Sequence, residues 1–168
     1  MECKLRKWCI EDAQNLAELL NNKKILDNLR DGLPFPYRVN DAQYYINSML
    51  NADKNSTFAF AIVYDGRVVG SIGVFRQSNI HSKTAELGYY IGEPYWNKGI
   101  ATNAVKSVCD YVFGNTDIIR IFAEPFARNF ASCRVLEKAG FLYEGTLIAN
   151  AVKNGKIEDM KMYAKIRN

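Results

Sequence analysis

The segment Asn97-Lys98-Gly99-Ile100-Ala101-Thr102 has the composition of an anion-binding loop. Strand-like alternation precedes it and helical periodicity follows it, so its backbone N–H groups form the first turn of a helix. Those groups have no partner within the helix, and the helix dipole is positive there, so the segment can hold a diphosphate. Gly99 and Ala101 allow a close approach to the main chain. An ordinary helix N-terminus with small packing residues would have the same sequence, so the segment alone does not distinguish an anion-binding loop from a structural one.

Other chemistries find little support in the sequence. The loop is neither a G-x-x-x-x-G-K-[ST] phosphate loop nor a G-x-G-x-x-G dinucleotide fingerprint. The four cysteines contain no C-x-x-C pair, and His81 has no neighbouring ligand, so we expect no metal site and reduced thiols. Cys133 has no base beside it and is not expected to be a nucleophile. The segment 70–73 misses the G-x-S-x-G nucleophile elbow by one position.

Periodicity predicts the elements that must position the loop. Glycine-containing turns at Asp65-Gly66 and Asn154-Gly155 predict two hairpins. The predicted strands are 3–8, 57–64, 67–75, 84–91, 118–123, 141–152 and 157–166, and the predicted helices are 11–20, 40–49, 99–113 and 129–139. We expect Asn40 to cap the second helix, and Gly114 and Gly140 to end the third and fourth.

This order predicts an α+β fold in one domain, residues 1–168. Hairpins dominate, but the strand–helix–strand unit at 84–123 requires one parallel, right-handed crossover. The result is a mixed, mostly antiparallel, twisted sheet of about seven strands with helices on both faces. A doubly wound dinucleotide-binding fold is excluded, because its strands would alternate with helices throughout.

Composition places the chain among ordinary globular proteins. Its 168 residues are 48% hydrophobic and 24% charged, which argues against disorder and fibrous structure. No apolar stretch is long enough for a membrane span, and the N-terminus lacks a signal-peptide core, so we expect a cytoplasmic protein without a membrane partner. The net charge of +4 comes from scattered residues, so no stable nucleic-acid partner is expected. Recruitment to RNA or ribosomes through this basic excess remains an alternative, which salt-dependent RNA binding would support.

Three segments together resemble the GNAT acetyltransferase superfamily: residues 89–102, Asn129-Phe-Ala-Ser132, and residues 136–141. The predicted element order is that of the superfamily across nearly the whole chain. The likeness is greater to its ribosomal-protein alanine N-acetyltransferase branch. That branch shares residues 33–37, the strand 85–89, Asn129-x-x-Ser132 and Phe141-x-x-Glu144-Gly145.

The resemblance implies an acetyl-CoA enzyme and identifies its cofactor contacts. The pantetheine arm is expected to bond the main chain of Tyr89, Tyr90 and Ile91 like an added strand. The pyrophosphate is expected on the amides of Asn97, Lys98, Gly99, Ile100, Ala101 and Thr102. A bulge or splay between the strands 84–91 and 118–123 would admit the thioester. Asn129 matches a family asparagine that contacts the arm, although a simple helix cap explains it equally well.

Amide formation also requires proton transfer. A primary amine is mostly protonated at neutral pH, so a base must take a proton, and the tetrahedral oxyanion needs N–H donors. The resemblance indicates Glu86 as the base, with Glu144 as second choice, although either could simply attract a cation. Ser132 is the expected proton donor or thiol contact, and a local backbone bond is its alternative. We expect oxyanion donors from a bulged strand near 89–91.

Two positions depart from the wider superfamily. Leu136 replaces the tyrosine that many members carry seven residues after the asparagine, and Trp96 replaces a Gln or Arg before the loop glycine. A catalytically silent acyl-CoA-binding module is therefore the alternative function. The acceptor is a primary amine, either a protein N-terminus such as ribosomal-protein alanine or a small molecule. Residues 31–39 and the last hairpin are expected to shape its pocket, and a homodimer is expected from the resemblance alone.

Overall fold

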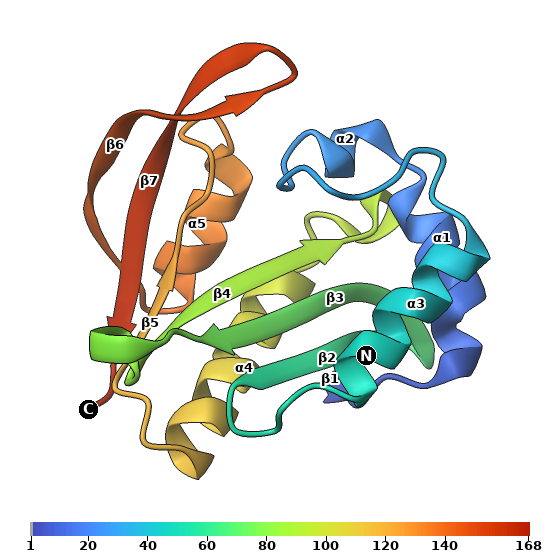
Figure 1. Cartoon of the computed structure of the whole chain (residues 1–168), viewed down its shortest axis with the longest axis horizontal. Helices are drawn as coiled ribbons and strands as arrows, with labels where there is room; N and C mark the ends of the chain where they lie inside the picture. Colours follow the sequence, from blue (N-terminus) through green and yellow to red (C-terminus); the bar gives the residue numbers. More distant parts are fainter. Residues whose placement is uncertain (1) are drawn as a thin grey trace.

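The computed structural model describes residues 2–168, and its centre is a seven-stranded sheet in the order β1-β2-β3-β4-β5-β7-β6 (Figure 1). The strands are β1 (Cys3–Arg6), β2 (Thr57–Tyr64), β3 (Arg67–Arg76), β4 (Thr84–Ile91), β5 (Arg120–Ala123), β6 (Leu142–Lys153) and β7 (Lys156–Ile166). The helices are α1 (Ala13–Leu20), α2 (Lys23–Leu26), α3 (Val39–Leu50), α4 (Ile100–Asn115) and α5 (Phe130–Lys138). Short 3₁₀ turns lie at Ile10–Asp12, Asn79–His81 and Glu93–Tyr95. The α+β class and the mixed sheet predicted from the sequence are confirmed.

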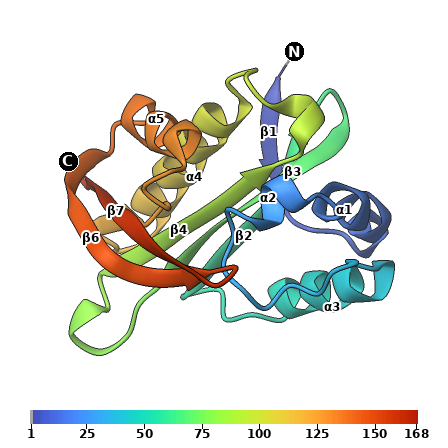
Figure 2. The same ribbon diagram turned by 90° about the horizontal axis from the view of Figure 1, so that it is seen from above.

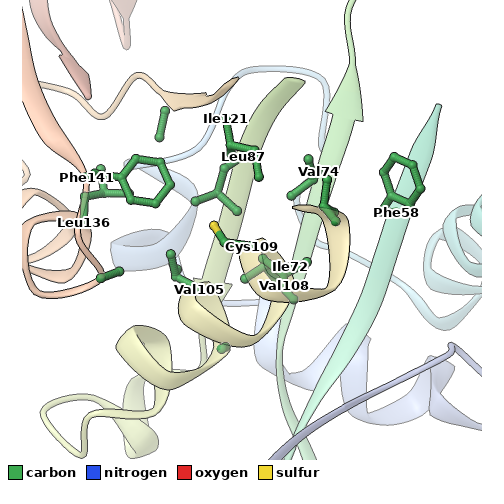
Figure 3. Packing of buried hydrophobic residues seen from close by; sticks show 14 of the residues in the cluster. Phe58, Ile72, Val74, Leu87, Val105, Val108, Cys109, Ile121, Leu136 and Phe141 are labelled. Atoms are coloured by element: carbon green, nitrogen blue, oxygen red, sulfur yellow. The ribbon is translucent and has the colours of Figure 1, made fainter. Parts of the chain in front are cut away.

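Helices cover both faces of the sheet, with α4 and α5 on one face and α1 and α3 on the other (Figure 2). The alternation of side chains along the strands explains the two layers. On β2, Ile62 packs in the cluster under α4, while the adjacent Ala61 packs in the cluster under α1 and α3. Figure 3 shows the first cluster, in which Val105 and Val108 of α4 lie against the sheet residues Ile72 and Leu87.

β4 pairs with β3 in the antiparallel direction and with β5 in the parallel direction. The lengths of these two ladders determine where the sheet opens. Its antiparallel register with β3 runs without a shift from Ala85↔Arg76 to Ile91↔Gly70. The bulge expected near residues 89–91 is therefore wrong. On its other side β4 pairs in parallel with β5 only from Thr84↔Arg120 to Glu86↔Phe122. Beyond Glu86 the two strands separate, and the predicted splay is confirmed.

Both predicted hairpin turns have the backbone that their letters require. Asp65 and Gly66 have φ angles of 52° and 75°, and Asn154 and Gly155 have 51° and 75°. These left-handed conformations are favourable for Asn, Asp and Gly. The turns therefore fix the pairing next to them, up to the register shift at Ile62/Val63 in β2–β3 and the shift at Leu147/Ala151 in β6–β7.

Two predicted helix ends are wrong. α3 begins at Val39, preceded by Arg38, whose N–H donates to the Asp41 carboxylate (2.8 Å), so Asn40 lies inside the helix. α4 runs through Gly114 to Asn115, because both the N–H and the hydroxyl of Thr116 donate to the carbonyl of Val112. Two bonds to one carbonyl close the last turn without a left-handed glycine.

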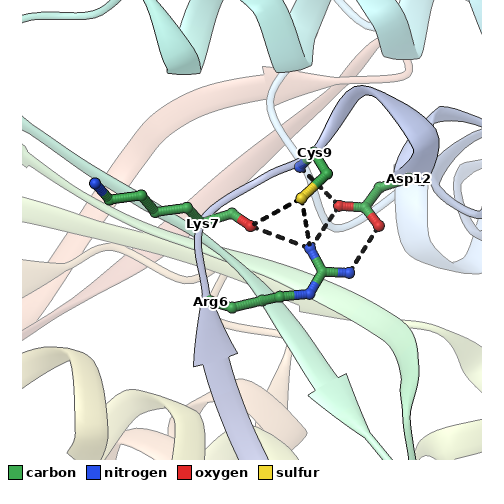
Figure 4. Close-up of polar contacts among 4 residues, drawn as sticks. All are labelled: Arg6, Lys7, Cys9 and Asp12. Atoms are coloured by element: carbon green, nitrogen blue, oxygen red, sulfur yellow. Dashed lines mark hydrogen bonds and ion pairs between the residues drawn. The ribbon is translucent and has the colours of Figure 1, made fainter.

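An ion pair fixes the connection from β1 to α1. The guanidinium of Arg6 donates to both oxygens of Asp12 at 2.7 and 2.8 Å, and the N–H of Cys9 donates to the same carboxylate at 2.9 Å (Figure 4). Burial by itself would raise the pKa of Asp12, but these hydrogen bonds outweigh it and hold the pKa below its usual range. No helix within residues 2–168 is long and apolar enough to cross a membrane.

Candidate active site

A cavity of about 1010 Å³ opens where β4 and β5 separate. It contains every site residue expected from the sequence apart from the second-choice base. These residues are Glu86, Tyr89, Tyr90, Ile91, Asn97, Lys98, Gly99, Ile100, Ala101, Thr102, Asn129 and Ser132. Segments far apart in the sequence therefore meet at one hollow, because the crossover helix α4 returns the chain to the sheet beside β4.

The edge of β4 that faces the cavity has main-chain groups directed away from β3. Gly92 N–H donates to Val69 O, and Thr84 O accepts from Gln77 N–H, both at 2.8 Å. Residues of even number thus bond β3, and those of odd number point toward the β5 side. Because the β5 ladder ends at Glu86, the N–H groups of Tyr89 and Ile91 face the splay. The indole N–H of Trp96 donates to the Ile91 carbonyl (2.7 Å) and holds the following loop against the strand end.

The loop at 97–102 has the geometry of an amide cradle. Asn97 and Gly99 adopt φ angles of 61° and 74°, and α4 starts at Ile100 immediately after them. The Gly99 carbonyl accepts the first helical bond from Asn103 N–H (3.1 Å), which leaves the preceding amides without helical partners. Lys98 lies with its Nζ 5.5 Å from the centre of the Tyr95 ring and adds positive charge beside the loop.

The start of α5 brings two hydroxyl groups together. Asn129 caps the helix, since its Oδ1 accepts from Ser132 N–H at 3.2 Å. The Ser132 hydroxyl lies 2.8 Å from the phenol oxygen of Tyr89 on β4. Burial raises the pKa of Tyr89 to about 12, although the hydrogen bond to Ser132 partly opposes the increase. The phenol is therefore protonated throughout the neutral range.

Two carboxylates and one guanidinium occupy the other side of the splay. Arg30 hydrogen-bonds and ion-pairs with Glu86, and its Nη2 lies 3.7 Å from Oε2 of Glu124. The side chains of Glu86 and Glu124 are only 22% and 21% exposed. Burial raises the pKa of Glu124, the charge of Glu86 raises it further, and Arg30 opposes both. Sequence reasoning missed Glu124, although a carboxylate directly after the buried strand 118–123 was a usable signal.

Glu144, the second-choice base, lies elsewhere. It is exposed on β6 and paired with Arg120, which donates to it from both terminal nitrogens. The hydrogen bond from Arg120 lowers the pKa of Glu144. Glu144 is not part of the cavity lining.

A roof made of residues 27–33 covers the cavity and is fastened to the last hairpin. Lys153 donates to Asp31 at 2.8 Å, and Asn154 donates to Asp27 at 3.0 Å. Arg128 adds bonds to the Asn28 side chain and the Asp27 carbonyl, each 2.7 Å. Figure 1 shows α2 beside the tip of the β6–β7 hairpin.

A group of hydroxyl side chains forms the floor on the α3 side. Tyr45 lies 3.4 Å from the Ser71 hydroxyl, and Tyr37 and Tyr90 line the same region. Burial raises the pKa of Tyr37 to about 12 and also raises that of Tyr45. The floor is thus polar but neutral. Within residues 2–168, no cluster of His, Cys, Asp and Glu is arranged to hold a metal ion.

The strand edge, the amide cradle and the half-buried carboxylates are the parts expected of a group-transfer site, and comparison with known proteins identifies its class. A family model described as "Acetyltransferase (GNAT) domain" matches residues 3–142. The probable N-acetyltransferase YjcK of Bacillus subtilis (strain 168) is 37% identical over 115 residues, covering 68% of this chain and 64% of YjcK, just under two thirds. The putative ribosomal N-acetyltransferase YdaF of Bacillus subtilis (strain 168) is 29% identical over 163 residues, covering 94% of this chain and 87% of YdaF.

A solved structure shows the same fold. The crystal structure of the ribosomal-protein-S5-alanine acetyltransferase from Vibrio fischeri matches with a TM-score of 0.88 and 24% identity, over 100% of this chain and 94% of that one. The chain belongs to the GNAT acetyltransferase family. The family and the fold expected from the sequence are confirmed. The microcin C7 self-immunity acetyltransferase MccE, solved in complex with acetyl-CoA and AMP, matches with a TM-score of 0.85 and 26% identity, over 98% of this chain and 92% of that one. Membership of the family makes this an N-acetyltransferase domain with acetyl-CoA as cosubstrate.

Proposed function

We propose that this chain transfers an acetyl group directly from acetyl-CoA to a primary amine, without a covalent enzyme intermediate. The observation that carries the proposal is the shared cavity, in which the free edge of β4, the 97–102 amides and two carboxylates converge. A strand edge can bind an extended amide-containing arm, and amides at a helix start can bind a diphosphate. A thioester held between them would lie beside the carboxylates at the splay.

The cofactor contacts of this proposal follow the cavity from end to end. The pantetheine arm runs along Tyr89, Tyr90 and Ile91 and bonds the main-chain groups of Tyr89 and Ile91, since those of Tyr90 bond β3. The pyrophosphate binds the 97–102 loop. Asn129 uses its side-chain oxygen to cap α5, so its amide nitrogen is the group that contacts the arm. The N–H groups that face the splay from β4 are the donors for the tetrahedral oxyanion.

Glu86 and Glu124 bind the acceptor amine and remove its proton. Both lie at the splay, and a carboxylate whose pKa is raised is a better base near neutral pH. Glu124 meets that requirement, while Glu86 carries the ion pair with Arg30 and attracts the cationic amine. Ser132 donates a hydrogen bond or a proton to the leaving thiolate.

The acceptor is a protein N-terminus, such as the alanine of a ribosomal protein, or a small-molecule amine. Similarity to YdaF, which is named as a putative ribosomal N-acetyltransferase, supports the first choice. The segment 31–39 and the last hairpin both line the cavity, through Asp31, Gly32, Leu33 and Tyr37 and through Met160, which supports their role in shaping the acceptor pocket. The cysteines described are free thiols, as is usual in the reducing cytoplasm, where we place the reaction.

An acceptor panel tests the function. Purified protein is incubated with acetyl-CoA and peptides with N-terminal alanine or serine, polyamines, amino sugars or amino acids, and free thiol and acceptor mass are followed. Turnover of one acceptor with an added acetyl mass is expected. Calorimetric binding of acetyl-CoA without turnover of any acceptor would instead support the silent binding module, and failure to bind coenzyme A would refute both.

A further inference from the structure

The leaving thiolate needs a proton donor, and α5 offers Ser132 but no tyrosine seven residues after Asn129. Position 136, where many family members have a tyrosine, holds Leu136, which is fully buried in the core between α4, α5 and the sheet. No group at that position reaches the cavity. The structure instead places a phenol there from another element, since Tyr89 extends from β4 to the first turn of α5.

Either hydroxyl can donate in the contact between Tyr89 and Ser132. The phenol oxygen lies 2.8 Å from Ser132 Oγ and 3.4 Å from the Ser132 carbonyl oxygen, so both neighbours can accept its proton. When Tyr89 donates to Oγ, the Ser132 hydroxyl proton is free to point into the cavity. Tyr90, the next residue, cannot replace Tyr89, because it extends from the opposite face of β4 toward Ser71.

We propose that Tyr89 and Ser132 form a two-hydroxyl relay that delivers a proton to the departing thiolate of coenzyme A. This inference rests on the proposed function. The amine nitrogen forms the new C–N bond, the C–S bond breaks with its electron pair on sulfur, and the carboxylate base takes the amine proton. Sulfur takes the proton of Ser132, and Ser132 takes the proton of Tyr89. Solvent then reprotonates Tyr89 and accepts the proton from the base, so the net products are the amide and the thiol.

The environment of Tyr89 suits a donor and excludes a base. Its phenol stays protonated at neutral pH, so a proton is available whenever the cofactor is bound. A phenol is a weaker acid than a thiol, so the proton moves through Ser132 only as charge grows on sulfur, and the reprotonation of Tyr89 by solvent completes the transfer. Tyr89 therefore acts through Ser132 and is a positioning residue.

The substitution Tyr89→Phe removes the phenol oxygen and keeps the ring. We expect kcat to fall by about tenfold to a hundredfold, the low end of general-acid contributions because a thiolate is a fair leaving group. The KM for acetyl-CoA stays within about twofold, since the main-chain contacts are unchanged. The matched control is Tyr163→Phe, which removes a phenol that donates to Glu137 (2.9 Å) outside the cavity and should leave kcat unchanged.

A double variant separates a relay from two independent effects. If the hydroxyls act in series, Tyr89→Phe combined with Ser132→Ala is no slower than the slower single variant. Losses that multiply would overturn the relay. So would a kcat for Tyr89→Phe equal to that of the Tyr163→Phe control, while turnover by the unmodified enzyme would keep the proposed function intact.

A second acetyl donor, in which selenium replaces the thioester sulfur of acetyl-CoA, gives a readout that a packing effect would not change. A selenolate is a weaker base than a thiolate and leaves without a proton, so the defect of Tyr89→Phe should shrink to about twofold or less with this donor. An equal defect with both donors would overturn the relay. If Tyr89→Phe does not fold, as judged by its melting temperature, the same comparison is made with Tyr89→Leu, which also lacks the hydroxyl group, and an equal defect with both donors would again overturn the relay.

Discussion

Glu124 and Glu86 lie together at the point where β4 and β5 separate, and the charge of Glu86 contributes to the raised pKa of Glu124. Arg30 from the roof contacts both carboxylates. This arrangement gives the two acids different tasks. Glu86 is held in an ion pair with Arg30, while the pKa of Glu124 is raised toward the pH range in which a carboxylate is a useful base.

Replacing Glu124 by Gln should lower kcat by about a hundredfold, the usual contribution of a general base. The base works only when ionised, so the rate for the unmodified enzyme should rise with pH through the raised pKa of Glu124. In Glu124→Gln, the inflection on the acidic side of the plot of kcat/KM against pH should disappear. Glu86→Gln should mainly raise the KM for the amine. A larger kcat loss for Glu86→Gln than for Glu124→Gln would reverse the two assignments.

The same residue predicts a pH-dependent gain in stability. Because the folded state raises the pKa of Glu124, it binds the proton more tightly than the unfolded chain, and stability falls as pH rises through that range. Glu124→Gln should therefore be more stable than the unmodified protein at pH 8, and the difference should vanish near pH 4. Urea unfolding at both pH values measures the difference in the free energy of unfolding between the two proteins. The same difference at pH 8 and pH 4 would show that folding does not raise the pKa of Glu124.

Arg30→Gln should lower the KM for a cationic acceptor severalfold. The guanidinium occupies the carboxylates that we assign to the amine, so its removal frees them. Arg67→Gln changes the same charge at an exposed position beside the β2–β3 turn, outside the cavity, and should leave the KM for the acceptor unchanged. A raised KM would mean that Arg30 recognises the acceptor rather than competing with it. Steady-state kinetics with the acceptor found in the panel distinguish the two.

Gly99→Ala should weaken coenzyme A binding by about tenfold, because a left-handed backbone costs an alanine about 1–2 kcal/mol and reorients the following amides. The φ of 74° causes the penalty, since no atom lies within 4 Å of an added Cβ. Gly114→Ala is the control, inside α4 and equally uncrowded, and should stabilise the fold by about 0.5–1 kcal/mol. Calorimetry measures the affinity for coenzyme A, and thermal unfolding measures the stability of each variant. Equal affinities for the two variants would mean that the loop amides do not bind the cofactor.

Asp12→Asn should destabilise the protein by about 1–2 kcal/mol at pH 7, since a buried charge-assisted pair is lost while Arg6 remains partly solvated. The lowered pKa of Asp12 makes this contribution present above the usual aspartate range, and it is lost as pH falls through the folded value. The difference from the unmodified protein should thus narrow below about pH 4. Asp110→Asn, on the exposed face of α4, should change stability little.

Local chemistry in the sequence was sufficient to predict the order of the strands and of the four longer helices, the two hairpin turns and the helix start at 97–102, but it missed the short helix α2 (Lys23–Leu26). Turns of Asp-Gly and Asn-Gly and the change of period at Thr57 act over a few residues, so a single chain displays them. The bulge near residues 89–91 and the end at Gly114 were wrong, because β3 and Thr116 supply partners that the local letters do not reveal.

What the sequence by itself determined is the backbone apparatus, since a strand edge and a helix start bind through main-chain groups whose position follows from local periodicity. The tertiary structure alone decided the side-chain chemistry. In the folded protein Glu86 and Glu124 both contact Arg30. Glu144 lies outside the cavity and pairs with Arg120, and the hydroxyl of Tyr89 contacts that of Ser132. Such pairs join residues up to 94 positions apart, from Arg30 to Glu124, and their distances depend on how the sheet splays and twists, which no local pattern encodes.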